Sequence, residues 1–229
     1  MKISLVFLTL NEIEGLKILF DKVPINDVDE VLAIDGGSND GTLEFFNEKD
    51  ILVFVQGIKG RGEAFKLAFE KAKGDALIFF SPDGNEDPSD ILKFEPLLEE
   101  GNDMVIATRM VKGAHNEEDN QVIKLRKWAN KTFNIMANFT WNKNFFISDT
   151  INGYRAITRK TWEKLGLDSR GYTIEYQSSI RAFKKGLKIA EFPTFEGERI
   201  DKQGGSPSVR TGLSFLRTYI SELKIGNNW

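Results

Sequence analysis

The chain has 229 residues, a net charge of -3, 41% hydrophobic and 28% charged residues, one histidine and no cysteine. This length and composition fit one large globular domain and exclude a wholly disordered chain, while the negative charge argues against a general nucleic-acid binder. The missing cysteine excludes disulfides, thiolate metal sites and a cysteine nucleophile, and His115 alone supports neither a multi-histidine zinc site nor a Ser-His-Asp triad.

The first hundred residues alternate between short apolar runs and helical patterns. We expect strands at 3–10, 28–34, 51–55, 76–80 and 104–107, and helices at 11–22, 42–47, 62–73 and 89–99. Strands separated by helices of this length predict a parallel sheet with helices on both faces. Ligands bind at the carboxyl ends of such strands, so the rule points to residues 9–11, 35–37 and 81–85.

The second half of the chain is less regular. Helical patterns cover 122–139, 174–185 and 213–223, strand patterns cover 153–158 and 187–192, and polar loops are expected at 112–120 and 197–208. The apolar run at the N-terminus is short and reads as a first strand rather than a signal peptide. No stretch approaches the roughly 18 to 20 apolar residues that cross a bilayer, so a cytoplasmic location is the default expectation.

One loop carries the residue types of a metal site. Asp83 follows the apolar run 76–80, and Asn85, Glu86 and Asp87 lie close behind it. Magnesium and manganese prefer oxygen ligands, and a metal can neutralise the charge that develops on a nucleotide diphosphate leaving group. Taken alone, such a loop is more often an acidic turn that caps the next helix. The metal-site interpretation is supported by three further polar motifs that precede this loop in the chain, at residues 11–12, 35–37 and 60–62.

These motifs resemble a known family. The order FLTLNE, AIDGGSNDGT, GRGEAFKLAFEKAKGD and FFSPDGNEDP is similar to the family-2 glycosyltransferases of the GT-A fold. The later segments DTINGYRAITRKTWEKLG, GYTIEYQSSIRAFKKGLKIAEFPT and ERIDKQGGS resemble the subgroup of dolichyl- or polyprenyl-phosphate sugar synthases. The resemblance implies one GT-A domain over residues 1–229, an α/β fold whose mostly parallel sheet is flanked by helices. Residues 1–110 would bind the nucleotide-sugar, and 111–229 would form the acceptor side and tail.

The resemblance also implies donor-binding residues. Thr9, Asn11 and Glu12 would lie at the base and ribose of the nucleotide, and Asp35, with Gly37 beside it, would accept hydrogen bonds there.

Arg61 would sit near the base or the phosphates. Asp83 matches the second acid of the family's Asp-x-Asp metal motif, and Ser81 stands at the first. Because Ser81 removes one carboxylate, Asn85 or the acidic residues after it are expected to join Asp83 in holding Mg²⁺ or Mn²⁺.

Two motifs are implied on the acceptor side. Asp149 and Arg155 belong to a segment that matches the subgroup's Asp-x-x-x-Gly-Phe-Arg pattern, in which Tyr154 replaces the phenylalanine. Arg199 and Ser206 match an Arg…Gly-x-Ser pattern that contacts phosphate groups, although Pro207 stands where a lysine often follows.

The family implies displacement with inversion at the anomeric carbon. A hydroxyl acceptor would need a general base, for which Asp149 and Glu175 are the candidates. A lipid-phosphate acceptor is already ionised, and Arg155, Arg199 or Arg210 would then position it.

Residues 122–146 allow two interpretations. The segment combines a helical apolar pattern with basic residues and with Trp128, Phe139, Trp141, Phe145 and Phe146. We favour a helix that covers the acceptor side of the sheet with its aromatic side chains in the core. The alternative, an amphipathic helix at the inner face of a membrane, stays open.

Three functions compete. The first is a glycosyltransferase of cell-envelope polysaccharide biosynthesis, using a UDP- or GDP-sugar and a lipid-phosphate or glycan acceptor. The second is a non-catalytic nucleotide-sugar-binding module, which Ser81 favours and Asp35, Asp83 and Arg199 disfavour. The third is a sugar-nucleotide nucleotidyltransferase, which would need a glycine-rich basic loop after the first strand, where residues 10–14 read LNEIE.

Overall fold

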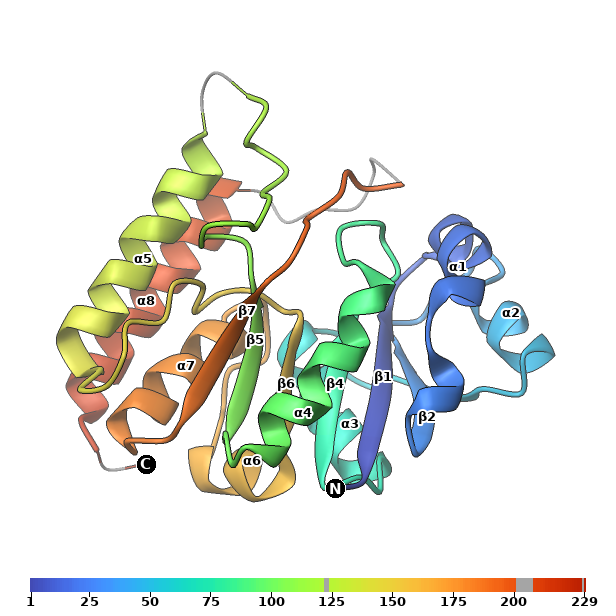
Figure 1. Cartoon of the computed structure of the whole chain (residues 1–229), viewed down its shortest axis with the longest axis horizontal. Helices are drawn as coiled ribbons and strands as arrows, with labels where there is room; N and C mark the ends of the chain where they lie inside the picture. The colour runs from blue at the N-terminus through green and yellow to red at the C-terminus, as the bar shows by residue number, and fades with distance from the viewer. Residues whose placement is uncertain (122–123, 201–207, 228) are drawn as a thin grey trace.

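A computed structural model describes residues 1–121, 124–200, 208–227 and 229. Its seven strands form one sheet in the order β3-β2-β1-β4-β6-β5-β7 (Figure 1). The strands are β1 (Ile3–Thr9), β2 (Glu30–Asp35), β3 (Leu52–Val55), β4 (Ala76–Phe80), β5 (Met104–Thr108), β6 (Arg155–Thr158) and β7 (Ile189–Pro193). Each expected strand is present within a few residues of its predicted bounds.

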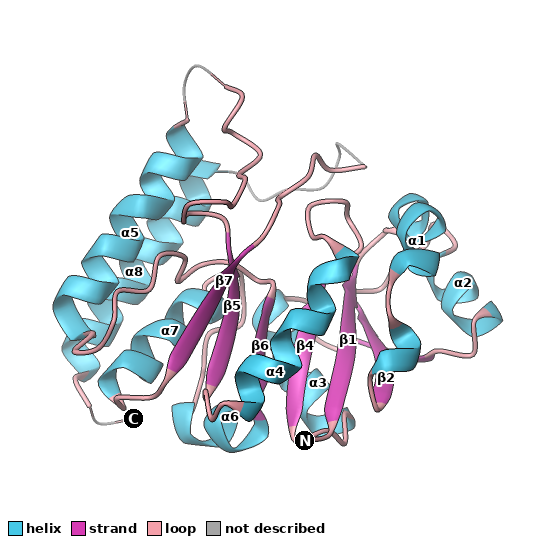
Figure 2. Cartoon of the chain, in the orientation of Figure 1, coloured by secondary structure: helices cyan, strands magenta, loops and turns pink. Residues whose placement is uncertain are grey.

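The helices alternate with the strands along the first half of the chain, as the sequence predicts (Figure 2). They are α1 (Ile13–Leu19), α2 (Thr42–Glu48), α3 (Arg61–Lys71), α4 (Phe94–Glu99), α5 (Leu125–Trp141), α6 (Arg159–Leu165), α7 (Ile174–Lys184) and α8 (Ser208–Ile225). Short 3-10 turns occupy Phe20–Lys22, Ile25–Asp27 and Pro88–Lys93. None of the described helices is long and apolar enough to span a bilayer.

The sheet is mostly parallel, with one exception. β6 lies between β4 and β5 and runs antiparallel to both, while the other neighbouring pairs are parallel. Helix α6, which the sequence analysis does not include, follows β6 directly. Thr158 caps its start by accepting a hydrogen bond from the Thr161 N–H, and Gly166 ends it in the left-handed region at φ 54°.

Both faces of the sheet are covered, because side chains of one strand point alternately to opposite faces. Ile3, Leu5 and Phe7 of β1 pack with α1 and α4, whereas Val6 and Leu8 belong to the core under α3 and α7. This arrangement explains why the central strands read as continuous apolar runs. Since β1, β2 and β4 are parallel neighbours, the polar residues that follow them meet at one edge of the sheet.

Candidate active site

The loop after β4 is folded around two carboxylates. The Ser81 N–H donates to Oε2 of Glu86 at 2.7 Å, and the Asn85 N–H donates to Oδ1 of Asp83 at 3.0 Å. Gly84 between them adopts φ 98°, a left-handed conformation that glycine adopts without strain. The loop therefore holds Asp83 and Glu86 at the carboxyl end of β4, as the sequence predicts for Asp83.

The segment after β7 lies against this loop. The Gly197 N–H donates to the Asn85 carbonyl at 3.0 Å, and the Ile200 N–H donates to the Asp83 carbonyl at 2.9 Å. These two bonds bring Nη2 of Arg199 to 3.2 Å from Oδ2 of Asp83. Arg199 thus reaches the predicted metal ligand, whereas Ser206 of the same motif lies outside the described residues.

Arg61 joins the loop to α7. Its Nε forms an ion pair with Oε1 of Glu175, and its Nη1 lies 3.5 Å from Oγ of Ser81. Burial alone would lower the pKa of Arg61, but the carboxylates of Glu175 and Glu86 outweigh it and raise that pKa. Gly153 permits this packing, since a Cβ there would lie 2.0 Å from Nη2 of Arg61.

Asp149 is enclosed by an arginine that the sequence analysis did not select. Arg109 donates from Nε to Oδ2 of Asp149 at 2.8 Å and from Nη2 to Oδ1 at 3.1 Å, and its Nη1 donates to Glu196 at 2.7 Å. Asp149 is fully buried and does not line the cavity. Its carboxylate is therefore occupied by Arg109 rather than turned to an acceptor. Since Arg109 directly follows β5, the strand-end rule could have identified it.

Arg155 is also withdrawn from the cavity. It is fully buried, and its guanidinium donates to the carbonyls of Asn152, Thr150 and Glu175 and to the hydroxyl of Ser178. Burial lowers the pKa of Arg155 to about 10. In this structure Arg155 ties the segment before β6 to α7. It does not line the cavity, so the expected contact between Arg155 and a phosphate does not fit this arrangement.

The predicted donor residues gather at the ends of β1 and β2. Asp35 is fully buried; its Oδ1 accepts from the N–H groups of Gly37 and Ser38 at 2.8 and 2.7 Å, and its Oδ2 accepts from the Thr9 hydroxyl at 2.8 Å. Oδ1 of Asn11 accepts from the Asn39 N–H at 3.0 Å. Asp35 and Thr9 thus hold the turn that follows β2. The backbone N–H of Glu12 donates to the Thr42 hydroxyl.

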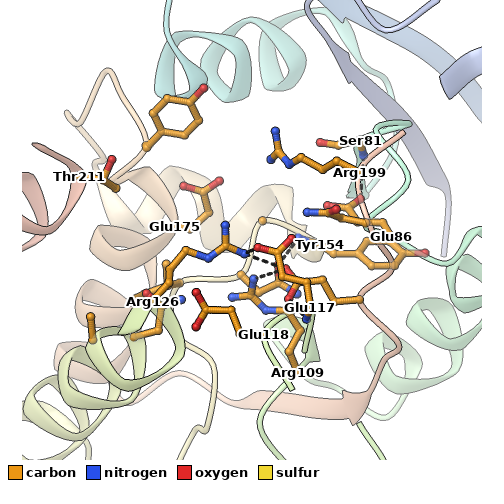
Figure 3. Close-up of a pocket in the computed structure, with 18 of the residues that line it drawn as sticks. Ser81, Glu86, Arg109, Glu117, Glu118, Arg126, Tyr154, Glu175, Arg199 and Thr211 are labelled. Atoms are coloured by element: carbon orange, nitrogen blue, oxygen red, sulfur yellow. Dashed lines mark hydrogen bonds and ion pairs between the residues drawn. The ribbon is translucent and has the colours of Figure 1, made fainter. Parts of the chain in front are cut away.

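A cavity of about 720 Å³ lies between the loop after β4 and the helices α5 and α8 (Figure 3). The predicted donor residues at the ends of β1 and β2, namely Thr9, Asn11, Glu12, Asp35 and Gly37, are not among the residues that line it. Arg61, Asp83, Asn85, Glu175 and Arg199, all selected from the sequence, line it together. The exposed Arg210 does not line it. A second set of residues was missed by the sequence analysis, namely Arg109, Glu117, Glu118, Arg126 and Glu196.

Arg126 is the second arginine of this missed set. It forms ion pairs with Glu117 and, at 3.8 Å, with Glu196. The pKa of Arg126 is lowered, first by burial and then by the neighbouring Arg109 and Arg199, although Glu196 opposes this. Figure 3 shows Arg126 and Arg109 reaching the same space from two directions. The cavity therefore concentrates guanidinium groups that are held by carboxylates.

The loop after β4 fits a divalent metal. Oδ1 of Asn85 is buried and has no hydrogen-bond partner in the described part of the chain. This amide oxygen is therefore available to coordinate a cation together with the Asp83 carboxylate. No three acidic or histidine side chains of the described residues are placed to hold a metal by themselves. This set suits Mg²⁺ or Mn²⁺, which keep several ligand positions for water and substrate phosphates.

Glu86 is another carboxylate of this loop. Burial, followed by the nearby Asp83, raises the pKa of Glu86 to about 8. Tyr154, which replaces the family's phenylalanine, is buried close by and donates its hydroxyl to the Asp87 carbonyl at 2.9 Å. The tyrosine therefore fastens the end of the loop after β4 to the residue that directly precedes β6.

Residues 4–162 match the family model of glycosyl transferase family 2. The chain belongs to this family. It is 29% identical over 214 residues to glycosyltransferase AglJ of Haloferax volcanii, a match that covers 92% of this chain and 69% of that protein. It is 28% identical over 222 residues to the polyprenol monophosphomannose synthase of Mycolicibacterium smegmatis, covering 86% of this chain and 79% of that one. The undecaprenyl-phosphate mannosyltransferase of Micrococcus luteus is 27% identical over 231 residues, covering 93% of this chain and 89% of that protein.

Solved structures agree on the fold. Glucosyl-3-phosphoglycerate synthase from Mycobacterium tuberculosis in complex with UDP has a TM-score of 0.76 at 21% identity, covering 99% of this chain and 82% of that chain. The fold of this family-2 glycosyltransferase is therefore GT-A, as the motifs imply. Its family places it among sugar transferases rather than among the nucleotidyltransferases.

Proposed function

We propose that this glycosyltransferase moves a sugar from a UDP- or GDP-sugar to the phosphate of a polyprenyl lipid, with inversion. The observation that carries the proposal is the mixed chemistry of the cavity lining. Asp83 and Asn85 of the loop after β4 line the same cavity as the cationic Arg109 and Arg126 and as apolar side chains of α5 and α8, among them Phe133 and Phe215. An acceptor with an anionic head and an apolar tail matches the arginines and the apolar side chains.

The relatives support both substrates. Two of them are named for polyprenol and undecaprenyl-phosphate acceptors. The synthase with the similar fold is solved with Mn²⁺, UDP-glucose and phosphoglyceric acid. We assign a divalent metal and a nucleotide-sugar donor to this chain as well, because Asp83 and the Asn85 oxygen, which has no partner among the described residues, are suitable metal ligands.

The loop after β4 would hold the donor diphosphate. Asp83 and Asn85 would coordinate Mg²⁺ or Mn²⁺, which when bound neutralises charge that develops on the leaving nucleoside diphosphate. Arg199 already contacts Oδ2 of Asp83, so it stands where it would meet the phosphates of a donor. Arg61, held by Glu175, lies on the other side of the loop at Ser81.

The transfer itself is a displacement. An oxygen of the lipid phosphate attacks the anomeric carbon, the bond from that carbon to the donor's β-phosphate oxygen breaks, and its electron pair leaves with the nucleoside diphosphate. A phosphate monoester is ionised at neutral pH and needs no general base. We therefore assign the positioning of the acceptor phosphate to Arg109 and Arg126 in place of Arg155, because both line the cavity.

A hydroxyl acceptor would change the demands on the site. It would need a carboxylate to take its proton. Glu175 lines the cavity and is the candidate for this role, whereas Asp149 is enclosed by Arg109. The ion pair between Glu175 and Arg61 would have to loosen for Glu175 to act as a base.

Thermal unfolding with UDP-, GDP- and CMP-sugars, with and without Mn²⁺, tests the donor assignment. A ligand at a hundred times its dissociation constant stabilises the folded state by about 2.7 kcal/mol. We expect a metal-dependent rise in melting temperature with one nucleotide class. Asp83→Ala should abolish it, and the matched control Asp87→Ala, in the same loop, should keep it. A shift without metal dependence would indicate a binding module, and no shift at millimolar concentration would contradict the donor site.

A further inference from the structure

Helix α5 buries two asparagines and exposes several large apolar side chains. Asn134, only 1% exposed, and the buried Asn138 donate hydrogen bonds to the carbonyls of Ser148 and Ile147 beneath the helix. An adjacent side of the helix carries Ile135, 56% exposed, and Phe139, 93% exposed. The expectation that the aromatic side chains of residues 122–146 fill the core is wrong for Trp128, Phe139, Phe145 and Phe146, which are exposed, whereas Trp141 packs against the core. Burying asparagines while exposing large apolar side chains reverses the pattern of a helix that faces water.

Helix α8 also carries large exposed apolar side chains. Leu213, Leu216, Ile220 and Leu223 are exposed and follow a spacing of three, four and three residues, so they form one stripe. α8 lies beside α5, as Figure 1 shows, and the rings of Trp141 and Tyr219 pack together at 5.0 Å.

The turn after α5 adds two exposed aromatic residues, Phe145 and Phe146. We call these residues, together with Trp128, Ile135, Phe139 and the stripe on α8, the α5/α8 face. Large exposed apolar side chains gathered on two neighbouring helices are typical of an interaction site.

The exposed charges on these two helices have one sign. The chain carries a net charge of -3, yet the exposed charged residues of α5 and α8 are Lys131, Arg210, Arg217 and Lys224. The acidic residue of α8, Glu222, is fully buried and paired with Arg181 at 2.9 Å. A surface that combines large apolar side chains with lysine and arginine is complementary to anionic lipid headgroups. Pairing with a second copy would bring the cationic rows together.

We propose that the α5/α8 face docks on the surface of an anionic lipid bilayer, with its apolar side chains among the headgroups. The inference rests on the proposed function in one respect, since the cavity is lined by Leu125 and Phe133 of α5 and Phe215 of α8. Docking this face would bring the apolar wall of the cavity next to the bilayer. A polyprenyl chain could then stay in lipid while its phosphate reaches Arg109 and Arg126.

Flotation of the full chain with vesicles tests the proposal. The vesicles are phosphatidylcholine with one quarter phosphatidylglycerol, and no sugar nucleotide or polyprenyl phosphate is added. We expect binding that weakens at high salt. Ile135→Ser combined with Phe139→Ser should lower the partition constant by about tenfold or more, because both side chains leave water on docking.

The matched control is Ile18→Ser on α1, at the far end of the molecule in Figure 1. Ile18 is 51% exposed, close to Ile135, so its replacement should leave the partition constant unchanged. The proposal is overturned if the chain does not bind vesicles, if the control weakens binding equally, or if the double variant abolishes a dimer in size-exclusion chromatography without any vesicle binding. Failure here leaves the proposed function untouched, because the nucleotide shift in thermal unfolding needs no vesicles.

Discussion

Replacing Asp149 by asparagine tests whether its carboxylate has a structural role or acts as a catalytic base. Oδ2 of Asp149 accepts from Nε and the backbone N–H of Arg109 at 2.8 and 3.2 Å, and Oδ1 accepts from Nη2 at 3.1 Å. Asparagine keeps one acceptor oxygen and turns an amide NH₂ toward the guanidinium. The variant therefore loses at least one charge-assisted hydrogen bond and a buried charge pair, although Glu196 still neutralises Arg109 at 2.7 Å.

We expect Asp149→Asn to lower the free energy of unfolding by about 3 kcal/mol, less than the full cost of stripping a buried ion of its partner. For a domain of this size that corresponds to a melting temperature lower by about 9 °C. Urea unfolding measures the free energy directly. Asp168→Asn is the control, because Asp168 also pairs with a buried arginine, Arg181 at 3.0 Å, but its side chain is 70% exposed; its cost should stay below about 1 kcal/mol. A variant Asp149→Asn that keeps its stability yet loses transfer would refute this reasoning and restore Asp149 as the base.

Three further predictions concern the loop after β4 and the residues packed around it. Because the pKa of Glu86 is raised to about 8, the folded chain binds a proton that the unfolded chain releases near 4.5, so stability should fall as pH rises between these values. Glu86→Gln should flatten that decline, by up to about 5 kcal/mol at pH 9, in urea unfolding at several pH values; an unchanged slope would contradict the assignment. Gly62→Ala should cost about 2 kcal/mol in the same assay, because its Cβ would lie 2.0 Å from the Ser169 carbonyl oxygen and backbone cannot yield; a neutral effect would show that this contact is loose. Gly153→Ala should instead keep stability within about 1 kcal/mol but lower kcat/KM for sugar transfer, since its Cβ would displace the flexible end of Arg61; unchanged kinetics would argue against a role for Arg61.

The sheet and one edge of the site were predictable because they depend on local patterns. Each buried strand reads as a short apolar run, and the polar residues directly after a strand reach the carboxyl edge of a parallel sheet. Asp83 and Asn85 were found in this way, whereas Arg61 came from the family resemblance, and all three line one cavity. The same rule applied to β5 would have selected Arg109, which follows Thr108 at once.

Other features depend on packing that local patterns do not report. Arg155 looks the same in the sequence whether it faces the cavity or the interior, and its direction follows from the insertion of β6 between β4 and β5. The orientation of α5 depends on whether its asparagines or its aromatic residues find partners, and the backbone at Ile147 and Ser148 decides in favour of the asparagines. Helix α6 has a capping threonine, Thr158, at its start and a terminating glycine, Gly166, at its end. It is only seven residues long, so its apolar pattern is too short to predict a helix.

The central claim is transfer of a sugar to a lipid phosphate, and one assay tests it most directly. The chain is incubated with Mn²⁺, the nucleotide-sugar that stabilises it and a short polyprenyl phosphate, and the lipid product is identified by mass spectrometry. The account predicts a polyprenyl-phosphate sugar of inverted anomeric configuration, with formation lost in Asp83→Ala and strongly reduced in Arg126→Ala. Transfer to a hydroxyl acceptor with none to the lipid phosphate, or a lipid product undiminished in Arg126→Ala, would contradict it.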